Sequence, residues 1–187
     1  LSNGSSVRRI IEAVPAAIDL TNANWQLSVE DWQPTNPYAT TFGIAATETR
    51  KSSVKVALQG LKAWPAIPAL QHSSGIGVYT TSFDLPADWT KSHGARISLG
   101  EVFDTFTVRV NDTPVSIDQI SAEGDISTQL KPGRNTITVR VATTLNNRLA
   151  KLDEDVAKRG IAQPYGLVGP VVLTPYGQAI VWPKTGR

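Results

Sequence analysis

The sequence predicts an all-β domain, an antiparallel β-sandwich with one or two short helices. Segments rich in β-branched and aromatic residues recur between residues 74 and 141, and Gly, Asn, Asp and Pro separate them. Within several segments apolar and polar residues alternate, which is the period of a strand with one buried face. At 187 residues the chain is long enough for one substantial core and short for two.

The first part of the chain carries one well-defined strand signal. Trp25, Leu27 and Val29 alternate with polar neighbours, which predicts a strand over residues 24–32 with its aromatic face inward. The remaining segments of the first 70 residues are predicted from three other signals: helical spacing of apolar residues, prolines, and a shortage of large apolar residues. In order, these are a short helix over residues 7–14, a long surface excursion over 33–53, a short strand over 55–58 and an irregular crossover over 61–70.

The centre of the chain contains the densest strand signals. Both faces of residues 76–85 carry apolar side chains, which predicts a central strand with neighbours on either side. Asn111 and Asp112 tolerate turn conformations and precede a renewed alternation, so they predict a hairpin. The further strands expected here are 95–99, 103–110 and 137–141, with a bend at Gly100 and a turn over 130–135.

The last part of the chain predicts one helix and two strands. Apolar residues at helical intervals and a Glu154–Lys158 pair predict a helix over residues 147–159, ended by Gly160. The stripe expected to be buried consists of Leu149, Leu152 and Val156. Strands are expected over residues 168–174 and 179–182.

Composition excludes several function classes. The 18 basic and 16 acidic residues leave a formal charge of +2 without a basic cluster, which argues against a nucleic-acid partner. The absence of Cys removes disulfides, thiol catalysis and Cys-based zinc sites. The sequence has no apolar run near the length of a membrane span, so we expect no membrane partner.

The start of the chain reads as a linker that leads into a module. It begins without Met and lacks the apolar core of a signal peptide, so we expect a piece of a longer chain. We divide it into an extension or linker over residues 1–20 and a β-sandwich domain over residues 21–187.

Several motifs in this order resemble the sugar-binding domain of family 2 glycoside hydrolases, a galactose-binding-like jelly roll. They are SGIGVYTTSFDLP (74–86), LGEVFD (99–104), VRVN (108–111) and LKPGRN (130–135). Other segments are similar to the jelly-roll region of secreted proteins that resemble family 106 α-L-rhamnosidases. These are residues 25–32, 64–68, VATTLNNRL (141–149) and YGLVGPV (165–171). Asp112 departs from the family pattern, which often has Gly there.

The resemblance implies a non-catalytic carbohydrate-binding or accessory module of a secreted plant-polysaccharide glycosidase. Its partners would be a plant cell-wall polysaccharide or oligosaccharide and the catalytic domain of the same protein. Two alternatives remain: a small glycosidase or lyase that uses Glu101 or Asp104 with Arg148, and a purely structural domain that braces a catalytic domain. Catalytic acids of such enzymes usually belong to a separate barrel, so no catalytic residue is assigned here.

Sugar recognition needs flat apolar surface for stacking and polar groups for hydroxyls. The sharpest polar candidates are Asn146, Asn147 and Arg148, which follow a strand and open a helix. An equally weighted interpretation makes one of the asparagines the cap of that helix. The further candidates for sugar contact are Trp64, Trp89, Tyr165, Glu101 and Asp104. For Tyr165 the alternative is a plug over one end of the sandwich.

Other chemistry has weaker signals. His72 and His93 have no partner at a metal-ligand spacing and are expected in surface loops. We expect no cofactor, although the family resemblance allows a structural calcium held by turn aspartates and carbonyls. Asn3 and Asn111 begin sequons and are candidate glycosylation sites, with a plain turn as the alternative at Asn111.

Overall fold

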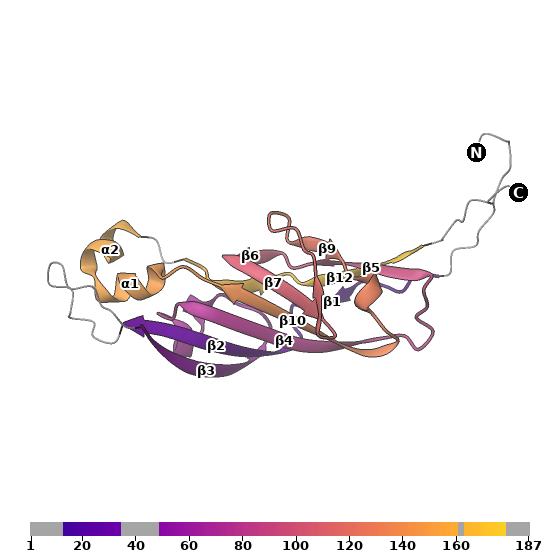
Figure 1. Ribbon diagram of the computed structural model, residues 1–187, viewed down its shortest axis with the longest axis horizontal. Coiled ribbons are helices and arrows are strands. Elements are labelled where there is room, and N and C mark those ends of the chain that lie inside the picture. The colour runs from indigo at the N-terminus through magenta and orange to yellow at the C-terminus, as the bar shows by residue number, and fades with distance from the viewer. Residues whose placement is uncertain (1–12, 35–48, 161–162, 179–187) are drawn as a thin grey trace, which may run out of the picture.

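A computed structural model describes residues 13–34, 49–160 and 163–178, and it confirms the predicted all-β sandwich (Figure 1). The strands are β1 (Ile18–Asp19), β2 (Asn24–Pro34), β3 (Thr49–Gln59), β4 (Gly75–Leu85), β5 (His93–Ser98), β6 (Glu101–Phe103), β7 (Thr105–Val110), β8 (Thr113–Val115), β9 (Glu123–Asp125), β10 (Gly133–Ala142), β11 (Gly166–Gly169) and β12 (Val172–Gly177). Two helices, α1 (Asn146–Leu152) and α2 (Glu154–Arg159), lie at one end of the sandwich.

The strands form two main sheets and one small pair, and every pair of named strands is antiparallel. One sheet has the order β3-β2-β4-β10-β7-β8, the other has the order β1-β12-β5-β9, and β11 pairs with β6. β4 lies between β2 and β10, which confirms the prediction of a central strand over residues 76–85.

The core lies between the inward faces of the two main sheets. On β2, Trp25, Leu27 and Val29 are almost completely buried, as their alternation predicts. On the opposite sheet, Ile97 of β5 and Leu173 of β12 have no exposed surface and belong to the same cluster. Hydrophobic burial between the sheets is therefore the main force that holds the sandwich together.

Trp64 enters this core from a short 3₁₀ helix, η1 (Trp64–Ala66), in the predicted crossover. Its ring lies over glycines on two strands: a Cβ at Gly77 would come within 2.5 Å of the ring, and one at Gly166 within 2.6 Å. The indole nitrogen donates a hydrogen bond to the Tyr79 hydroxyl at 2.7 Å. Trp64 is therefore a core residue, and the glycines provide the space for its ring.

The predicted hairpin at Asn111 and Asp112 is present between β7 and β8. Asn111 has a φ of 48° and Asp112 a φ of 62°, and Val110 pairs with Thr113 across the turn. Two successive positive φ values are typical of a type I′ turn, which matches the twist of the flanking strands. Asp112 therefore occupies a left-handed position that Gly would adopt without strain.

The predicted excursion over residues 33–53 is too long at both ends. β2 continues to Pro34 and β3 begins at Thr49, and these two residues pair with each other. β3 is accordingly longer than the predicted strand over 55–58, since main-chain hydrogen bonds extend it without large apolar side chains.

The prediction of one helix over residues 147–159 is wrong. The chain leaves the helical region at Asp153, whose side chain accepts hydrogen bonds from the amides of Asp155 and Val156 and caps α2. The predicted buried stripe also fails, because Leu149 is 47% exposed and Leu152 is 41% exposed. Gly160 follows the end of α2, as expected. The predicted strand over 179–182, and all but the last two residues of the helix predicted over 7–14, lie outside the described residues.

Candidate functional site

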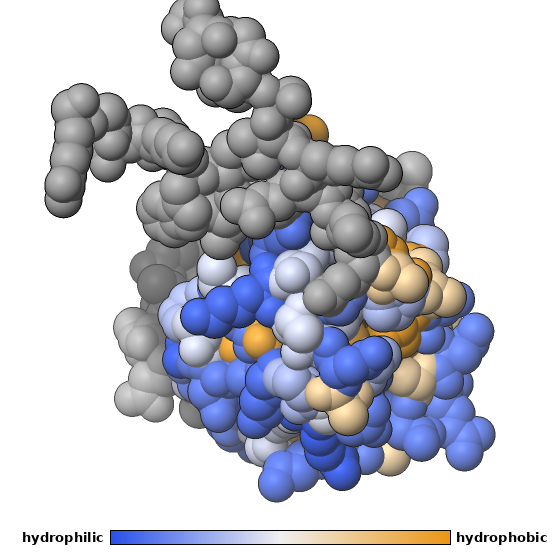
Figure 2. Space-filling view, turned by 90° about the vertical axis from the view of Figure 1, so that its right-hand side faces the viewer, coloured by the Kyte–Doolittle hydropathy of each residue, from blue (hydrophilic) through white to orange (hydrophobic). Residues whose placement is uncertain are grey.

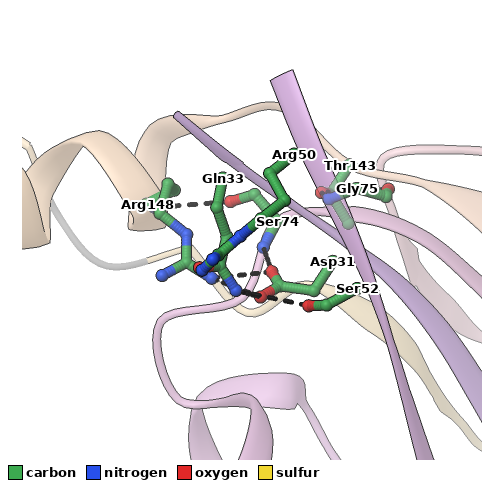
Figure 3. Close-up of polar contacts among 8 residues, drawn as sticks. All are labelled: Asp31, Gln33, Arg50, Ser52, Ser74, Gly75, Thr143 and Arg148. Carbon is green, nitrogen blue, oxygen red and sulfur yellow. Dashed lines mark hydrogen bonds and ion pairs between the residues drawn. The ribbon is translucent and has the colours of Figure 1, made fainter. Parts of the chain in front are cut away.

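The first turn of α1 is tied to β2 by an ion pair. Arg148 donates from Nη2 to both carboxylate oxygens of Asp31, at 2.7 and 2.6 Å (Figure 3). Asp31 also accepts hydrogen bonds from the Ser74 amide at 3.1 Å and from Gln33 Nε2 at 2.7 Å. Its side chain is 5% exposed and that of Arg148 is 14% exposed, so the pair is largely shielded from water. The charge of Arg148 is thus paired with Asp31 inside the fold, while its Nε atom is buried without a hydrogen-bond partner in the described part of the chain.

Asp31 is a partner that the sequence analysis missed. It lies on the inward parity of β2, two residues beyond Val29, where an apolar residue would continue the pattern. A carboxylate on the buried face of a strand requires a charged or hydrogen-bonded partner. The carboxylate at an inward position of the strand could therefore have indicated a buried charge pair from the sequence. It does not identify which distant cation is the partner.

Asn147 is buried and bridges two segments. Its side chain donates to the carbonyl oxygen of Gln163 and accepts from the amide of Gln163, both at 2.9 Å. The cap of α1 is Leu145, with no side-chain hydrogen bond, so neither asparagine has the predicted capping role. Asn146 is half-buried, and its side-chain Nδ2 donates to Asn147 Oδ1 at 3.4 Å.

The aromatic candidates are in the interior. Tyr165 and Trp64 have no exposed surface, and their rings meet edge to face at 6.3 Å. The Tyr165 hydroxyl lies 2.5 Å from Thr144 Oγ1 and closes the α1 end of the sandwich, as the plug interpretation expected. Trp89 is 6% exposed and packs against the His93 ring at 5.1 Å. None of these residues presents an open ring face for stacking on a sugar.

The two acidic candidates differ in their surroundings. Asp104 accepts a hydrogen bond from the Thr144 amide at 2.8 Å and so holds the segment that leads into α1. Glu101 is exposed on β6. In residues 13–34, 49–160 and 163–178, no three His, Asp or Glu side chains gather as metal ligands. We assign no role to a metal.

An apolar groove runs along α1 next to the ion pair. Leu145, which precedes α1, is 43% exposed, and with Leu149 and Leu152 of α1 it lines one side of this groove. The groove, of about 130 Å³, is lined by Trp32, Gln33, Pro34, Thr49, Leu145, Arg148, Leu149 and Leu152. We call it the leucine groove.

A larger cleft, of about 730 Å³, lies at the opposite end, near the connection between β4 and β5. We call it the distal cleft; its lining is Trp89, Thr90, Lys91, His93, Asp125, Ser127, Thr128, Leu130, Lys131, Pro132, Tyr176 and Gln178. His93 was expected in a surface loop and is 6% exposed at the start of β5. Its Nδ1 lies 3.1 Å from the Thr90 amide and its Nε2 lies 3.2 Å from the Ala13 carbonyl oxygen. The Thr90 amide thus donates to Nδ1, and Nε2 donates to the Ala13 carbonyl oxygen.

The Asn111 sequon has a structural use. The side-chain nitrogen of Asn111 donates to the Gln129 carbonyl and to Asn135 Oδ1, both at 2.8 Å, and its oxygen accepts from the Thr136 amide at 3.0 Å. A glycan would replace one of the two N–H donors on that nitrogen. The turn interpretation therefore accounts for Asn111 fully, while Asn3 lies outside the described residues.

No protein-family model matches the chain, and no curated protein matches it either. Solved structures do. A rhamnosidase from Novosphingobium sp. PP1Y matches at a TM-score of 0.63 with 24% identity, over 91% of this chain and 16% of that chain. A β-glucuronidase from Ruminococcus gnavus matches at 0.53 with 16% identity, over 91% and 31%. A GH2 β-galacturonidase from Eisenbergiella tayi matches at 0.51 with 15% identity, over 88% and 25%.

These likenesses confirm, at the level of fold, the resemblance to the sandwich domains of rhamnosidase-like and family 2 glycosidases. The chain spans less than a third of each of these three structures. Its fold therefore occurs there as one part of a larger glycosidase chain. Within the described residues, no helix is long and apolar enough to cross a membrane.

Proposed function

We propose that the chain is a non-catalytic accessory module of a secreted, rhamnosidase-like glycoside hydrolase, and that its α1 end braces the catalytic domain of the same polypeptide. The observation that carries this proposal is the contrast at that end between polar side chains with partners inside the fold and exposed leucines. The side-chain amide of Asn147 and the charge of Arg148 have partners inside the fold, while Leu145, just before α1, and Leu149 and Leu152 of α1 remain exposed beside them.

The leucine groove suits a protein partner better than a sugar. An exposed row of leucines gains free energy when another apolar surface covers it, and monomeric proteins rarely leave such rows open. A pyranose ring needs a flat face with hydroxyl partners nearby, and the one guanidinium in the groove is already paired with Asp31. The occupant we propose is therefore an apolar surface of the adjoining catalytic domain.

The test uses the full-length polypeptide that carries this module. The double variant Leu149→Ser and Leu152→Ser should lower the melting temperature of the catalytic domain and its hydrolytic activity, because the bracing contact is lost. Ile120→Ser is the matched control, since Ile120 is 97% exposed on a loop between β8 and β9. Equal behaviour of the double variant and the control would overturn the bracing role.

Direct catalysis by this chain is the competing hypothesis, with Glu101 or Asp104 as the acid. Asp104 already holds the Thr144 amide, which supports a structural role. A screen of the isolated chain against aryl glycosides and pectic oligosaccharides should show no hydrolysis. Turnover that is lost in Glu101→Gln or Asp104→Asn would contradict the accessory assignment.

Sugar binding is the second candidate function, and the distal cleft is the observation that favours it. The first turn of α1, Asn146–Arg148, is the other proposed sugar site, and a glycan array with the isolated chain and with Arg148→Ala tests it. Specific binding that disappears in a folded Arg148→Ala variant would support that site. Binding that persists would direct attention to the distal cleft.

A further inference from the structure

We propose that the distal cleft is a binding site for a carboxylated oligosaccharide, one that contains uronic acid residues. This inference concerns different residues from the leucine groove, so the two proposals can fail separately. The connection between β4 and β5, which lines the cleft, lies at the end of the sandwich opposite α1 and α2 (Figure 1). Figure 2 looks onto this end, where the visible coloured surface is mostly hydrophilic with small apolar areas between polar side chains.

Tyr176 provides a rigid aromatic surface in the cleft. Its ring lies against Gly94 of β5, where a Cβ atom would come within 2.4 Å of the ring carbon Cζ. Its hydroxyl donates a short hydrogen bond to Asp125 Oδ2 and lies 3.1 Å from Ser127 Oγ. The ring is thus fixed by packing and by its hydroxyl group before any ligand arrives. A preorganised ring avoids the entropy cost of ordering a side chain on binding.

The charged groups of the cleft favour an anion. Asp125, its one carboxylate, accepts hydrogen bonds from Tyr176 and from the Ser127 amide. Lys91 and Lys131 come from two different loops, and neither ammonium group has an ion-pair partner in the part of the chain that the structure describes. Two unpaired cations beside one hydrogen-bonded carboxylate give the cleft a positive bias that attracts negatively charged ligands.

The size and the mixed lining indicate a sugar chain rather than a small anion. A cleft of about 730 Å³ falls in the range of organic ligand sites, far above the volume that one phosphate or acetate needs. Leu130 and Pro132 add apolar surface, and Thr90, Thr128 and Gln178 add hydroxyl and amide groups suited to sugar hydroxyls. Aromatic surface, neutral polar groups and two cations together match the chemistry of a uronic acid oligomer.

The experiment titrates the 187-residue chain with tetragalacturonic acid, with its fully methyl-esterified form and with poly-glutamate, followed calorimetrically and by amide chemical shifts. We expect binding of the free acid, at least tenfold weaker binding of the ester, and shifts at residues 125–132 and 176–178. Rising salt should weaken the binding, because the lysines are exposed.

Variants locate the site. Lys91→Gln and Lys131→Gln should each weaken binding of the free acid about threefold, as expected for exposed charge pairs, and Tyr176→Ala about tenfold. Lys55→Gln on β3 is the matched control for loss of one positive charge. Tyr176→Phe keeps the aromatic ring and removes only the hydroxyl group. If Tyr176→Ala unfolds, a folded Tyr176→Phe variant that still binds shows that the ring is sufficient for stacking.

Four results would overturn the proposal: no binding of the acid, equal binding of acid and ester, equal binding of poly-glutamate, or shifts confined to the first turn of α1, Asn146–Arg148. The first would leave the bracing role of the leucine groove intact. The last would support the other sugar site instead.

Discussion

Arg148 and Asp31, which are 117 residues apart, form a hydrogen-bonded ion pair that joins α1 to β2. The pair is largely buried, and the Ser74 amide completes the partners of Asp31 Oδ1. This contact gives Arg148, in the first turn of α1, a structural role in place of the ligand contact that the sequence analysis proposed. It also sets the position of α1, and with it the leucine groove.

Removing one partner of this pair should be costly. Arg148→Ala leaves a buried carboxylate without its cation, so we expect a loss of about 3 kcal/mol in the free energy of unfolding. Urea denaturation followed by tryptophan fluorescence measures this change. Lys158→Ala is the control, since that side chain is 68% exposed in its pair with Glu154 and should change stability little. Equal effects of the two substitutions would contradict a buried pair.

The hydroxyl of Tyr79 should stabilise the core at neutral pH and make that stability sensitive to alkaline pH. It accepts hydrogen bonds from Trp64 Nε1 and the Leu167 amide, and Tyr79→Phe leaves both buried donors unpaired, at a cost of about 1–3 kcal/mol. Burial raises the pKa of Tyr79 to about 12 from 10.0. Because the folded pKa is raised, this contribution to stability is full below pH 10 and is lost as pH rises towards 12.

Denaturation of the parent and of Tyr79→Phe at pH 8, 10 and 11 tests both parts. The difference in free energy of unfolding between the two proteins should shrink as the pH rises. A difference that stays constant with pH would mean that Tyr79 ionises alike in the folded and unfolded states.

Any substitution of Asn111 should lower the free energy of unfolding. Asn111→Asp keeps the size of the side chain but removes the N–H donors to Gln129 and Asn135, so we expect a destabilisation of about 1–2 kcal/mol. Asp112→Gly, in the same turn, should instead stabilise the chain by about 0.5 kcal/mol, because Gly adopts a positive φ without strain. Thermal unfolding of both variants provides the comparison, and a stable Asn111→Asp variant would contradict the proposed role.

Asp125 should make the distal end sensitive to acid. Burial is the largest single influence and raises the pKa of this carboxyl, but the hydrogen bonds from Tyr176 and Ser127 outweigh it and leave the pKa below its ordinary value of 3.8. A lowered folded pKa gives stability that is present above pH 3.8 and is lost as pH falls through the folded pKa. Asp125→Asn should therefore reduce the loss of stability between pH 5 and pH 2.5, measured by urea denaturation. If the free energy of unfolding of Asp125→Asn falls with pH as steeply as that of the parent, carboxyl groups other than Asp125 cause the loss of stability in acid.

Local patterns were sufficient for most strands and insufficient for the loops. The inward positions of Trp25 and of Val139 follow from alternation alone, because period two and burial of one face are properties of each strand by itself. The helix prediction failed because leucines at helical spacing do not say whether a partner covers them. In the described residues Leu149 and Leu152 remain exposed, so that information lay outside the segment.

The sequence by itself determined most of the strands, the inward faces of the strands it predicted, the turn at Asn111 and Asp112, and hence the sandwich fold. Only the tertiary structure decided which partners the candidate site residues have and whether they are buried. Arg148 pairs with Asp31, Asn147 pairs with Gln163, and Tyr165 is covered by the α1 end of the sandwich. The physical reason is range: alternation and turn chemistry act within a few residues, whereas burial and charge pairing depend on residues that only the folded chain brings together.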